Sequence, residues 1–157
     1  DGIRIRNCDW SSDVCSSDLT GGFTHFLKET IDRLNLDCHF LTYDIYNYPW
    51  YDKLLDEGVD LRVENVFSSD YSSVSQEVID FIQSDGVTIV LCDGGNKKLE
   101  FNLLSNYLKV NDFILAHDYS YDKDYFDINI DKKIWNWFEI SEKDIEESCE
   151  KIGRAHV

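Results

Sequence analysis

Hydrophobic residues along the chain alternate between a helical and a strand-like spacing. Between Phe23 and Leu34 they recur every three or four residues, which predicts an amphipathic helix directly after the glycine pair Gly21-Gly22. Residues 38–45 follow with the composition of a strand. The same reasoning predicts a short helix at residues 50–55, a strand at residues 59–67, and a helix containing Val78, Ile79 and Ile82 behind a capping box of Ser73 and Gln76.

Two short apolar runs predict buried strands. Residues 87–92 and 113–116 are continuous runs of apolar residues, which is typical of strands covered on both faces of a mostly parallel sheet. Between them, the spacing of leucines over residues 99–108 predicts a helix. Near the end, residues 134–140 predict a strand with three aromatic side chains, and Ser141 with Asp144 predicts the cap of a terminal helix.

This order of elements indicates the fold class. Strands that alternate with helices favour right-handed crossover connections between parallel strands. We therefore expect an α/β fold with a doubly wound, mostly parallel, Rossmann-like sheet that is incomplete at both ends. Because many functions share such a fold, the function has to be inferred from the residues at its ligand-binding edge.

The two ends of the chain have a different character. Residues 9–19, DWSSDVCSSDL, resemble the in-frame translation of a sequencing-library adapter, and residues 1–4 and 152–157 resemble further pieces of such oligonucleotides. Sequence of this origin is excluded from reasoning about the fold. We therefore assign residues 1–19 and 152–157 to the adapter and residues 20–151 to one partial domain. We expect residues 3–6 to pair with the sheet as a substitute for its missing first strand.

Composition narrows the possible partners and the location. The chain has 31 acidic and 15 basic residues and a net charge of −16, so its field repels phosphate backbones and argues against nucleic acid as a partner. No apolar run approaches the roughly 20 residues that span a bilayer, so we expect no membrane segment. Cys38, Cys92 and Cys149 are scattered without a CxxC pair, which favours reduced thiols and a cytoplasmic location.

A first candidate site combines the glycine pair with Asp44. In open α/β sheets, ligands lie beyond the carboxyl ends of the strands, close to helix N-termini. Gly21 and Gly22 precede the first helix, and Asp44 follows about 20 residues later at the end of a predicted strand, which is the spacing of an acid that binds the ribose of a nucleotide. The alternative is an ordinary glycine turn and a solvated loop acid.

A second candidate site lies after the two apolar strands. Asp93 ends one of them and the pair His117-Asp118 follows the other, so the three side chains are expected to converge on a divalent cation or on a reacting hydroxyl. Two carboxylates suit magnesium, whereas the imidazole extends the choice to manganese or iron, or serves as a general base. The alternative is structural, with Asp93 capping a turn and Asp118 forming an Asx-turn.

These residues also carry a family resemblance. The stretch VLCDGGNKKLEFNLLSNYLKVNDFILAHDYS at residues 90–120, with GGFTHFL and TYDI upstream, resembles class I S-adenosylmethionine-dependent methyltransferases. The resemblance is to the small bacterial and phage proteins grouped near macrocin O-methyltransferases and cephalosporin-hydroxylase-like proteins. It implies methyl transfer from S-adenosylmethionine to an oxygen of a small-molecule or sugar acceptor.

The resemblance also implies roles for particular residues. Gly21 and Gly22 would belong to the cofactor loop, and Asp44 would bind the ribose of S-adenosylmethionine. Asp93 and Asp118 would match acidic metal-site positions. His117 departs from the acid or amide that metal-dependent relatives have beside the second carboxylate, which makes another divalent cation an alternative to magnesium. Two other functions remain open: a metal-dependent phosphoesterase or hydroxylase, and a nucleotide-binding protein without turnover.

Two further groups have ordinary structural interpretations. Lys97 and Lys98 follow the Asp-Gly-Gly turn and are expected to be solvated at the start of a helix, with orientation of an acceptor as the alternative. The aromatic residues after the last apolar strand are expected to pack in the core, with an acceptor pocket as the alternative. They are Tyr121, Tyr125, Phe126, Trp135, Trp137 and Phe138.

Overall fold

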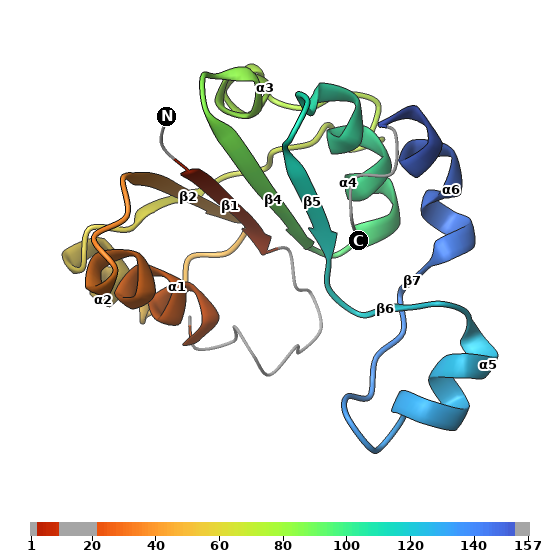
Figure 1. Ribbon diagram of the computed structural model, residues 1–157. Coiled ribbons are helices and arrows are strands. Elements are labelled where there is room, and N and C mark those ends of the chain that lie inside the picture. Colours follow the sequence, from red (N-terminus) through yellow and green to blue (C-terminus); the bar gives the residue numbers. More distant parts are fainter. Residues whose placement is uncertain (1–2, 10–21, 153–157) are drawn as a thin grey trace.

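A five-stranded parallel sheet forms the centre of the protein (Figure 1). The computed structural model describes the backbone of residues 3–9 and all of residues 22–152. The strand order is β3-β2-β1-β4-β5, and every neighbouring pair in it is parallel. The strands are β1 (Ile3–Asp9), β2 (Cys38–Asp44), β3 (Asp60–Val63), β4 (Val87–Asp93) and β5 (Phe113–Ala116).

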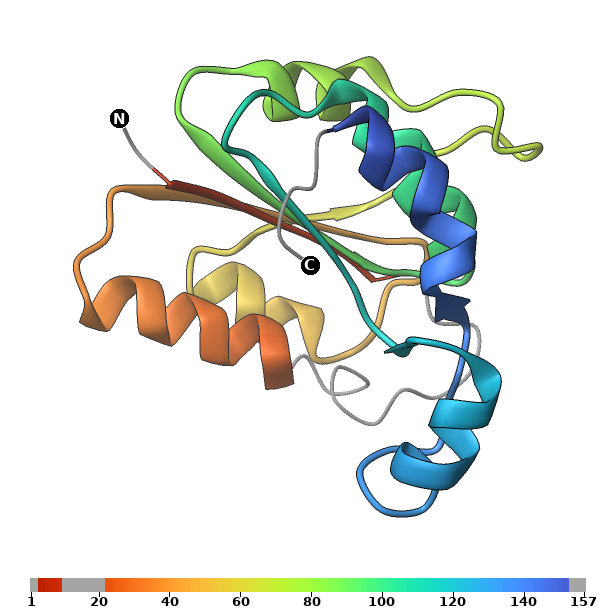
Figure 2. The same cartoon turned by 45° about the vertical axis from the view of Figure 1, so that its right-hand side comes forward.

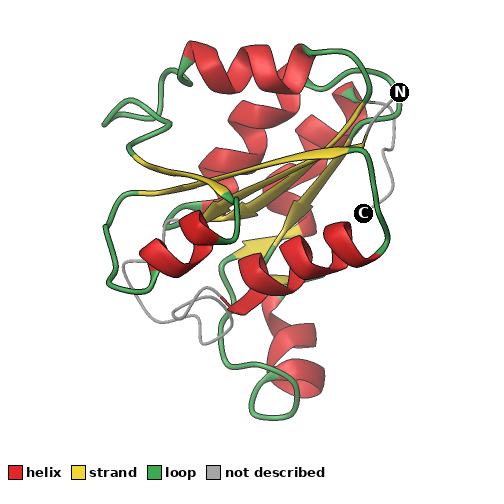
Figure 3. Cartoon of the chain, turned by 90° about the vertical axis from the view of Figure 1, so that its left-hand side faces the viewer, coloured by secondary structure: helices red, strands yellow, loops and turns green. Residues whose placement is uncertain are grey.

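Helices lie on both faces of this sheet (Figure 3). On one face lie α1 (Gly22–Arg33) and α2 (Tyr51–Asp56), whereas α3 (Gln76–Gln83), α4 (Lys97–Leu104) and α6 (Glu142–Lys151) lie on the other (Figure 2). A short 3-10 helix, η1 (Ser105–Tyr107), continues α4. The mixed α/β class expected from the sequence is therefore confirmed. None of the helices in the described part of the chain has the length and apolar character needed to cross a bilayer.

The expected pairing of the N-terminal segment is also confirmed, and it extends beyond residues 3–6. Strand β1 occupies the middle of the sheet, with Ile3–Asp9 hydrogen-bonded between β2 and β4. Without it, the facing edges of β2 and β4 would leave backbone donors and acceptors without partners, which costs about 1 to 3 kcal/mol for each buried group. This cost explains why the available strand takes the central position.

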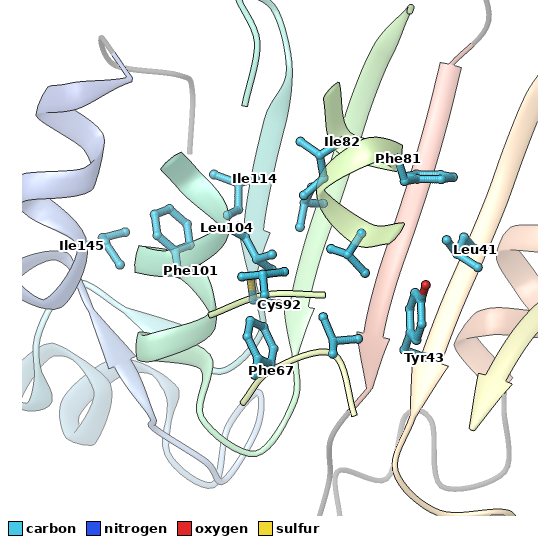
Figure 4. Close-up of a cluster of buried hydrophobic side chains, with 14 of the residues drawn as sticks. Leu41, Tyr43, Phe67, Phe81, Ile82, Cys92, Phe101, Leu104, Ile114 and Ile145 are labelled. Carbon is cyan, nitrogen blue, oxygen red and sulfur yellow. The ribbon is translucent and has the colours of Figure 1, made fainter. Parts of the chain in front are cut away.

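Alternate residues of β2 contribute to two separate cores. On β2, Leu41 and Tyr43 pack with α3 and α4 in the larger core (Figure 4), whereas Phe40 points to the opposite face. There Phe40 contacts Ile31 of α1 and Leu54 of α2 in a smaller core. Because helices cover both faces of β2, adjacent residues of this strand are buried on opposite faces, and Phe40 to Asp44 are all buried.

The two apolar strands are buried less symmetrically than expected. On β5, Ile114 is buried, but its neighbours Phe113 and Leu115 are 38% and 42% exposed. On β4, Val90 and Cys92 are fully buried, while alternate residues are only half-buried. The expectation that both faces are covered is therefore wrong for β5 and only partly met for β4. On their face of the sheet, the described helices α1 and α2 contact β2 and β3 and lie away from β5 (Figure 1).

After β5 the chain makes an excursion that projects from the carboxyl edge of the sheet (Figure 1). It contains β6 (Tyr119–Ser120), α5 (Lys123–Tyr125), the π-helical turn η2 (Phe126–Ile130) and β7 (Ile140–Ser141), with β6 and β7 paired in parallel. The strand predicted at residues 134–140 is wrong, since only its last residue lies in β7. In this segment, Trp135 makes a single bridge to Asp131 and no longer ladder forms around it.

The aromatic residues of this excursion also differ from the expectation. Phe126 is buried and packs against Phe138, with ring centroids 5.4 Å apart. Trp135, Trp137, Tyr121 and Tyr125 are exposed instead of packed in the core. The apolar residues here are too few to enclose four more large rings away from the sheet.

One expected helix cap is confirmed and one is wrong. Ser141 and Asp144 form a capping box at the start of α6, in which the Ser141 N–H donates to Asp144 Oδ2 at 3.0 Å. Helix α3 begins after Ser75 and not after Ser73. Strand β3 is also shorter than predicted, because Val66 and Phe67 are buried in the larger core from a connecting segment.

Candidate functional site

The candidate metal-binding residues meet at the carboxyl ends of β4 and β5. Asp93 is the last residue of β4, and His117 and Asp118 directly follow β5, its hydrogen-bonded neighbour. The His117 N–H donates to the Cys92 carbonyl at 3.0 Å, which fixes the chain as it leaves the sheet. One ligand atom from each of Asp93, His117 and Asp118 lies within 4.8 Å of the others. The expected convergence of these three side chains is confirmed.

Electrostatic contacts dominate this cluster. His117 Nδ1 lies 3.1 Å from Asp118 Oδ1 and 3.1 Å from Asp93 Oδ1. The two oxygens share a single Nδ1–H, so neither contact has the geometry of a full hydrogen bond and both are mainly ionic. The carboxylates of Asp118 and Asp93 raise the pKa of His117 to about 10, so the imidazole is protonated at neutral pH. Burial alone would raise the pKa of Asp118, but His117 and Lys97 outweigh it and lower that pKa.

Two buried oxygen atoms of the cluster lack a hydrogen bond. Asp93 and Asp118 are each only 4% exposed, and the Oδ1 atom of each accepts no hydrogen bond from the described residues. Each of these atoms instead faces His117 Nδ1 at 3.1 Å, and a divalent cation would offer both oxygens a direct bond that this contact does not provide. Two carboxylate oxygens and an imidazole nitrogen form a suitable partial ligand set for a divalent cation, which would displace the proton that His117 carries at neutral pH.

The backbone at Asp118 makes a tight turn directly after β5. Its φ angle is +57°, in the left-handed region, which costs a residue other than glycine about 1 to 2 kcal/mol. The Asp118 carbonyl accepts a hydrogen bond from the Glu139 N–H at 3.2 Å, which joins the turn to the far end of the excursion.

Lys97, in the first turn of α4, is the main residue of this cluster that the sequence did not reveal. Its side chain is 5% exposed, and its Nζ lies 2.8 Å from Glu139 Oε2, 3.2 Å from Asp118 Oδ2 and 3.9 Å from Asp93 Oδ1. Nζ also donates to the Gly94 carbonyl at 3.1 Å. Burial alone would lower the pKa of Lys97, but the surrounding carboxylates, Glu139 foremost, raise it.

The expectation of a solvated Lys97 is therefore wrong, whereas Lys98 is exposed and pairs with Asp144 at 2.6 Å. The only sequence signal for the role of Lys97 was its spacing of four residues from Asp93.

Glu100 holds the turn that presents Asp93 and Lys97. Its carboxylate accepts hydrogen bonds from the Gly94 N–H at 3.1 Å and the Asn96 N–H at 3.0 Å. Asn96 in turn caps α4 by accepting a hydrogen bond from the Leu99 N–H at 3.2 Å. Burial raises the pKa of Glu100 to about 7. Sequence reasoning missed Glu100 because it lies one residue beyond the usual capping-box position.

Asp44 lies at the same edge of the sheet but in separate surroundings. In the register of the sheet, Tyr43, Cys8, Cys92 and Ala116 lie opposite one another on neighbouring strands. Asp44 and Asp93 are the next residues of β2 and β4, so both strands end at the same height, with β1 between them. Because β2 and β4 are two strand spacings apart, the backbones of Asp44 and Asp93 are separated by about 10 Å. The three carboxylates expected to share one edge therefore do so, although only Asp93 and Asp118 are in one contact cluster.

The contacts of Asp44 rule out the solvated loop acid considered above. It is 5% exposed and accepts hydrogen bonds from the Tyr46 N–H at 2.8 Å and from the Tyr51 hydroxyl. A small pocket beside it is lined by Thr24 of α1, Thr42 of β2 and the aromatic side chains of Trp50 and Tyr51, among others.

The glycine pair lies only partly within the described residues. Gly22 is the first residue of α1, whose N-terminal end is at the carboxyl edge of the sheet (Figure 1). Gly21 lies outside the described residues. The expected helix is therefore present, but it begins at the second glycine and not behind the pair.

Sequence and structure comparisons add no relative to this description. No protein-family model, no curated protein and no solved structure matches the chain.

Proposed function

We propose that the chain is part of an S-adenosylmethionine-dependent O-methyltransferase whose acceptor site holds a divalent cation. The observation that carries this proposal is the convergence of Asp93, His117 and Asp118 at the carboxyl edge of a parallel sheet, with two buried Oδ1 atoms that accept no hydrogen bond. The acceptor would be a small molecule or a sugar. The cytoplasmic location expected from the cysteines remains a prediction.

The sheet supports this proposal through its strand order. In the order β3-β2-β1-β4-β5, the chain runs outward from β1 in one direction and then returns to β4 on the other side. We propose that this is the core of a doubly wound, Rossmann-like sheet. In such sheets, ligands bind beyond the carboxyl ends of the strands where the order reverses, here between β1 and β4. Asp44 and Asp93 flank that position.

Asp44 and the glycine pair would form the cofactor side of the site. When bound, S-adenosylmethionine supplies an electrophilic methyl group on a sulfonium. Asp44 would accept hydrogen bonds from the ribose hydroxyls in place of the one it now accepts from Tyr51. The N-terminal end of α1, behind Gly21 and Gly22, would offer backbone N–H groups to the cofactor.

Asp93, His117 and Asp118 would form the acceptor side. A cation held there would lower the pKa of an acceptor hydroxyl. Because the ligand set mixes carboxylates with an imidazole, it suits manganese or iron(II) better than magnesium. The main contribution of the chain is placement: holding two reactants in a reactive geometry supplies roughly 7 to 11 kcal/mol of a reaction barrier in well-oriented systems.

Crossed titrations of two variants test this division of the site. S-adenosylhomocysteine and Mn²⁺ are titrated separately into the wild type, Asp44→Asn and Asp93→Asn by isothermal calorimetry, with circular dichroism to confirm folding. We expect Asp44→Asn to lose nucleoside binding and keep Mn²⁺ binding, and Asp93→Asn to do the reverse. A folded wild type that binds neither ligand refutes the proposal. Nucleoside binding without methyl transfer to a panel of hydroxyl acceptors favours the nucleotide-binding alternative.

A further inference from the structure

The most unusual charge at the carboxyl edge is the buried ammonium of Lys97. It lies within 4 Å of three carboxylates, Asp93, Asp118 and Glu139, and is only 5% exposed. A buried ammonium needs such partners to offset its desolvation, and buried carboxylates equally need a cation. Together with the protonated His117, Lys97 is therefore a built-in counter-ion of the acid cluster.

The contacts of Lys97 are unevenly distributed over the carboxylate oxygens. Its nearest carboxylate atoms are Glu139 Oε2 at 2.8 Å and Asp118 Oδ2 at 3.2 Å. The oxygen atoms that lack a hydrogen bond are the Oδ1 atoms of Asp93 and Asp118, on the side of His117. Lys97 thus occupies one oxygen of Asp118 and leaves the other one directed toward Asp93 and His117.

We propose that Lys97 is a positioning residue that stabilises the acid cluster without metal and weakens its affinity for a divalent cation. This inference rests on the proposed cation site. A cation about 2.2 Å from Asp93 Oδ1 lies within roughly 6 Å of Lys97 Nζ, because the nitrogen is 3.9 Å from the same oxygen. The two positive charges repel each other, so the cation and Lys97 compete for the same negative charge.

The size of this repulsion sets the expected effect. For a divalent and a monovalent charge 6 Å apart, Coulomb's law with the dielectric constant of water corresponds to about tenfold in affinity, and a less polar site gives more. Removing the ammonium should therefore tighten cation binding, although it removes a buried ion pair. A residue that only maintained the local structure would weaken binding when replaced.

Mn²⁺ binding to matched lysine variants tests the proposal. The loss of the free Mn²⁺ signal in electron paramagnetic resonance gives the dissociation constant for the wild type, Lys97→Met and the neighbouring control Lys98→Met. We expect Lys97→Met to bind Mn²⁺ at least about tenfold more tightly. Lys98→Met should match the wild type within about twofold, because Lys98 is exposed and pairs with Asp144. Unchanged or weaker binding by folded Lys97→Met overturns the proposal.

If Lys97→Met does not fold, a second variant, Glu139→Gln, tests the proposal. Glu139→Gln removes the carboxylate nearest to Lys97 and leaves its ammonium to Asp118 and Asp93, so Mn²⁺ binding should weaken several-fold. Unchanged or tighter binding by Glu139→Gln also overturns the role of Lys97. A wild type that binds no Mn²⁺ refutes the cation site itself, whereas wild-type binding that ignores the Lys97 substitution refutes only the present inference.

Discussion

Glu100 provides a quantitative test of how the site is held together. Its carboxyl group is fully buried under the Asp93-Gly94-Gly95-Asn96 turn and accepts two backbone hydrogen bonds there. Burial nevertheless dominates and raises its pKa from 4.5 to about 7. The substitution that isolates this effect is Glu100→Gln, because glutamine has nearly the same shape as the protonated acid and cannot ionise.

The expected magnitude follows from linkage between protonation and folding. Because the pKa of Glu100 is higher in the folded state, its contribution to stability is fully present below pH 4.5 and is lost as the pH rises through about 7. A rise from 4.5 to about 7 corresponds to about 3 kcal/mol. Relative to Glu100→Gln, the wild type should therefore lose about 3 kcal/mol of unfolding free energy between pH 4.5 and pH 8.

Urea unfolding of both proteins, followed by tryptophan fluorescence at half-unit steps from pH 4.5 to 8, measures this difference. The comparison cancels the titration of every group that the two proteins share. A difference in unfolding free energy that stays constant over the whole range would refute the assignment of Glu100 as a buried acid with a raised pKa. A difference that changes in the opposite direction would show that the two N–H donors outweigh burial.

Three more predictions concern the same region and the sheet. Lys97→Met should cost about 3 to 5 kcal/mol of unfolding free energy in metal-free urea unfolding, because it removes the buried cation shared by Asp93, Asp118 and Glu139. The exposed control Lys98→Met should cost less than about 1 kcal/mol. The pKa of His117 is raised to about 10, so the metal-free wild type should lose unfolding free energy relative to His117→Gln as the pH rises from 6.5 to 10. If the unfolding free energies of the two proteins change in parallel with pH, this prediction is contradicted. Ile114→Ala should cost about 2 to 5 kcal/mol and Leu115→Ala clearly less, because only Ile114 is buried; equal losses in thermal or urea unfolding would show that both faces of β5 are covered.

Much of the local structure could be predicted because it depends on neighbours along the chain. The three- and four-residue spacing after Gly22 gives α1, and the apolar run at residues 113–116 coincides with β5. Where several structures satisfy the same local pattern, the prediction failed. Residues 134–140 have the aromatic content of a strand, but a strand also needs a partner edge, and none of the described strands offers one there.

The same distinction between local patterns and distant contacts applies to the candidate site. Asp93 and the His117-Asp118 pair could be placed together because each follows an apolar strand, and parallel strands end at one edge. Glu139 could not be placed there, since 42 residues separate it from Lys97 and nothing local indicates their contact. The exposed position expected for Lys97 was the ordinary one for a lysine in the first turn of a helix.

The sequence by itself determined the order of helices and strands as far as β5 and the edge at which the acids gather, because periodicity and strand ends are local properties. Only the tertiary structure decided which charges are buried together. An ammonium or a carboxyl group stays in the interior when partners offset its desolvation. For Lys97 those partners come from β4, from the turn after β5 and from the end of the excursion, and folding alone brings them together.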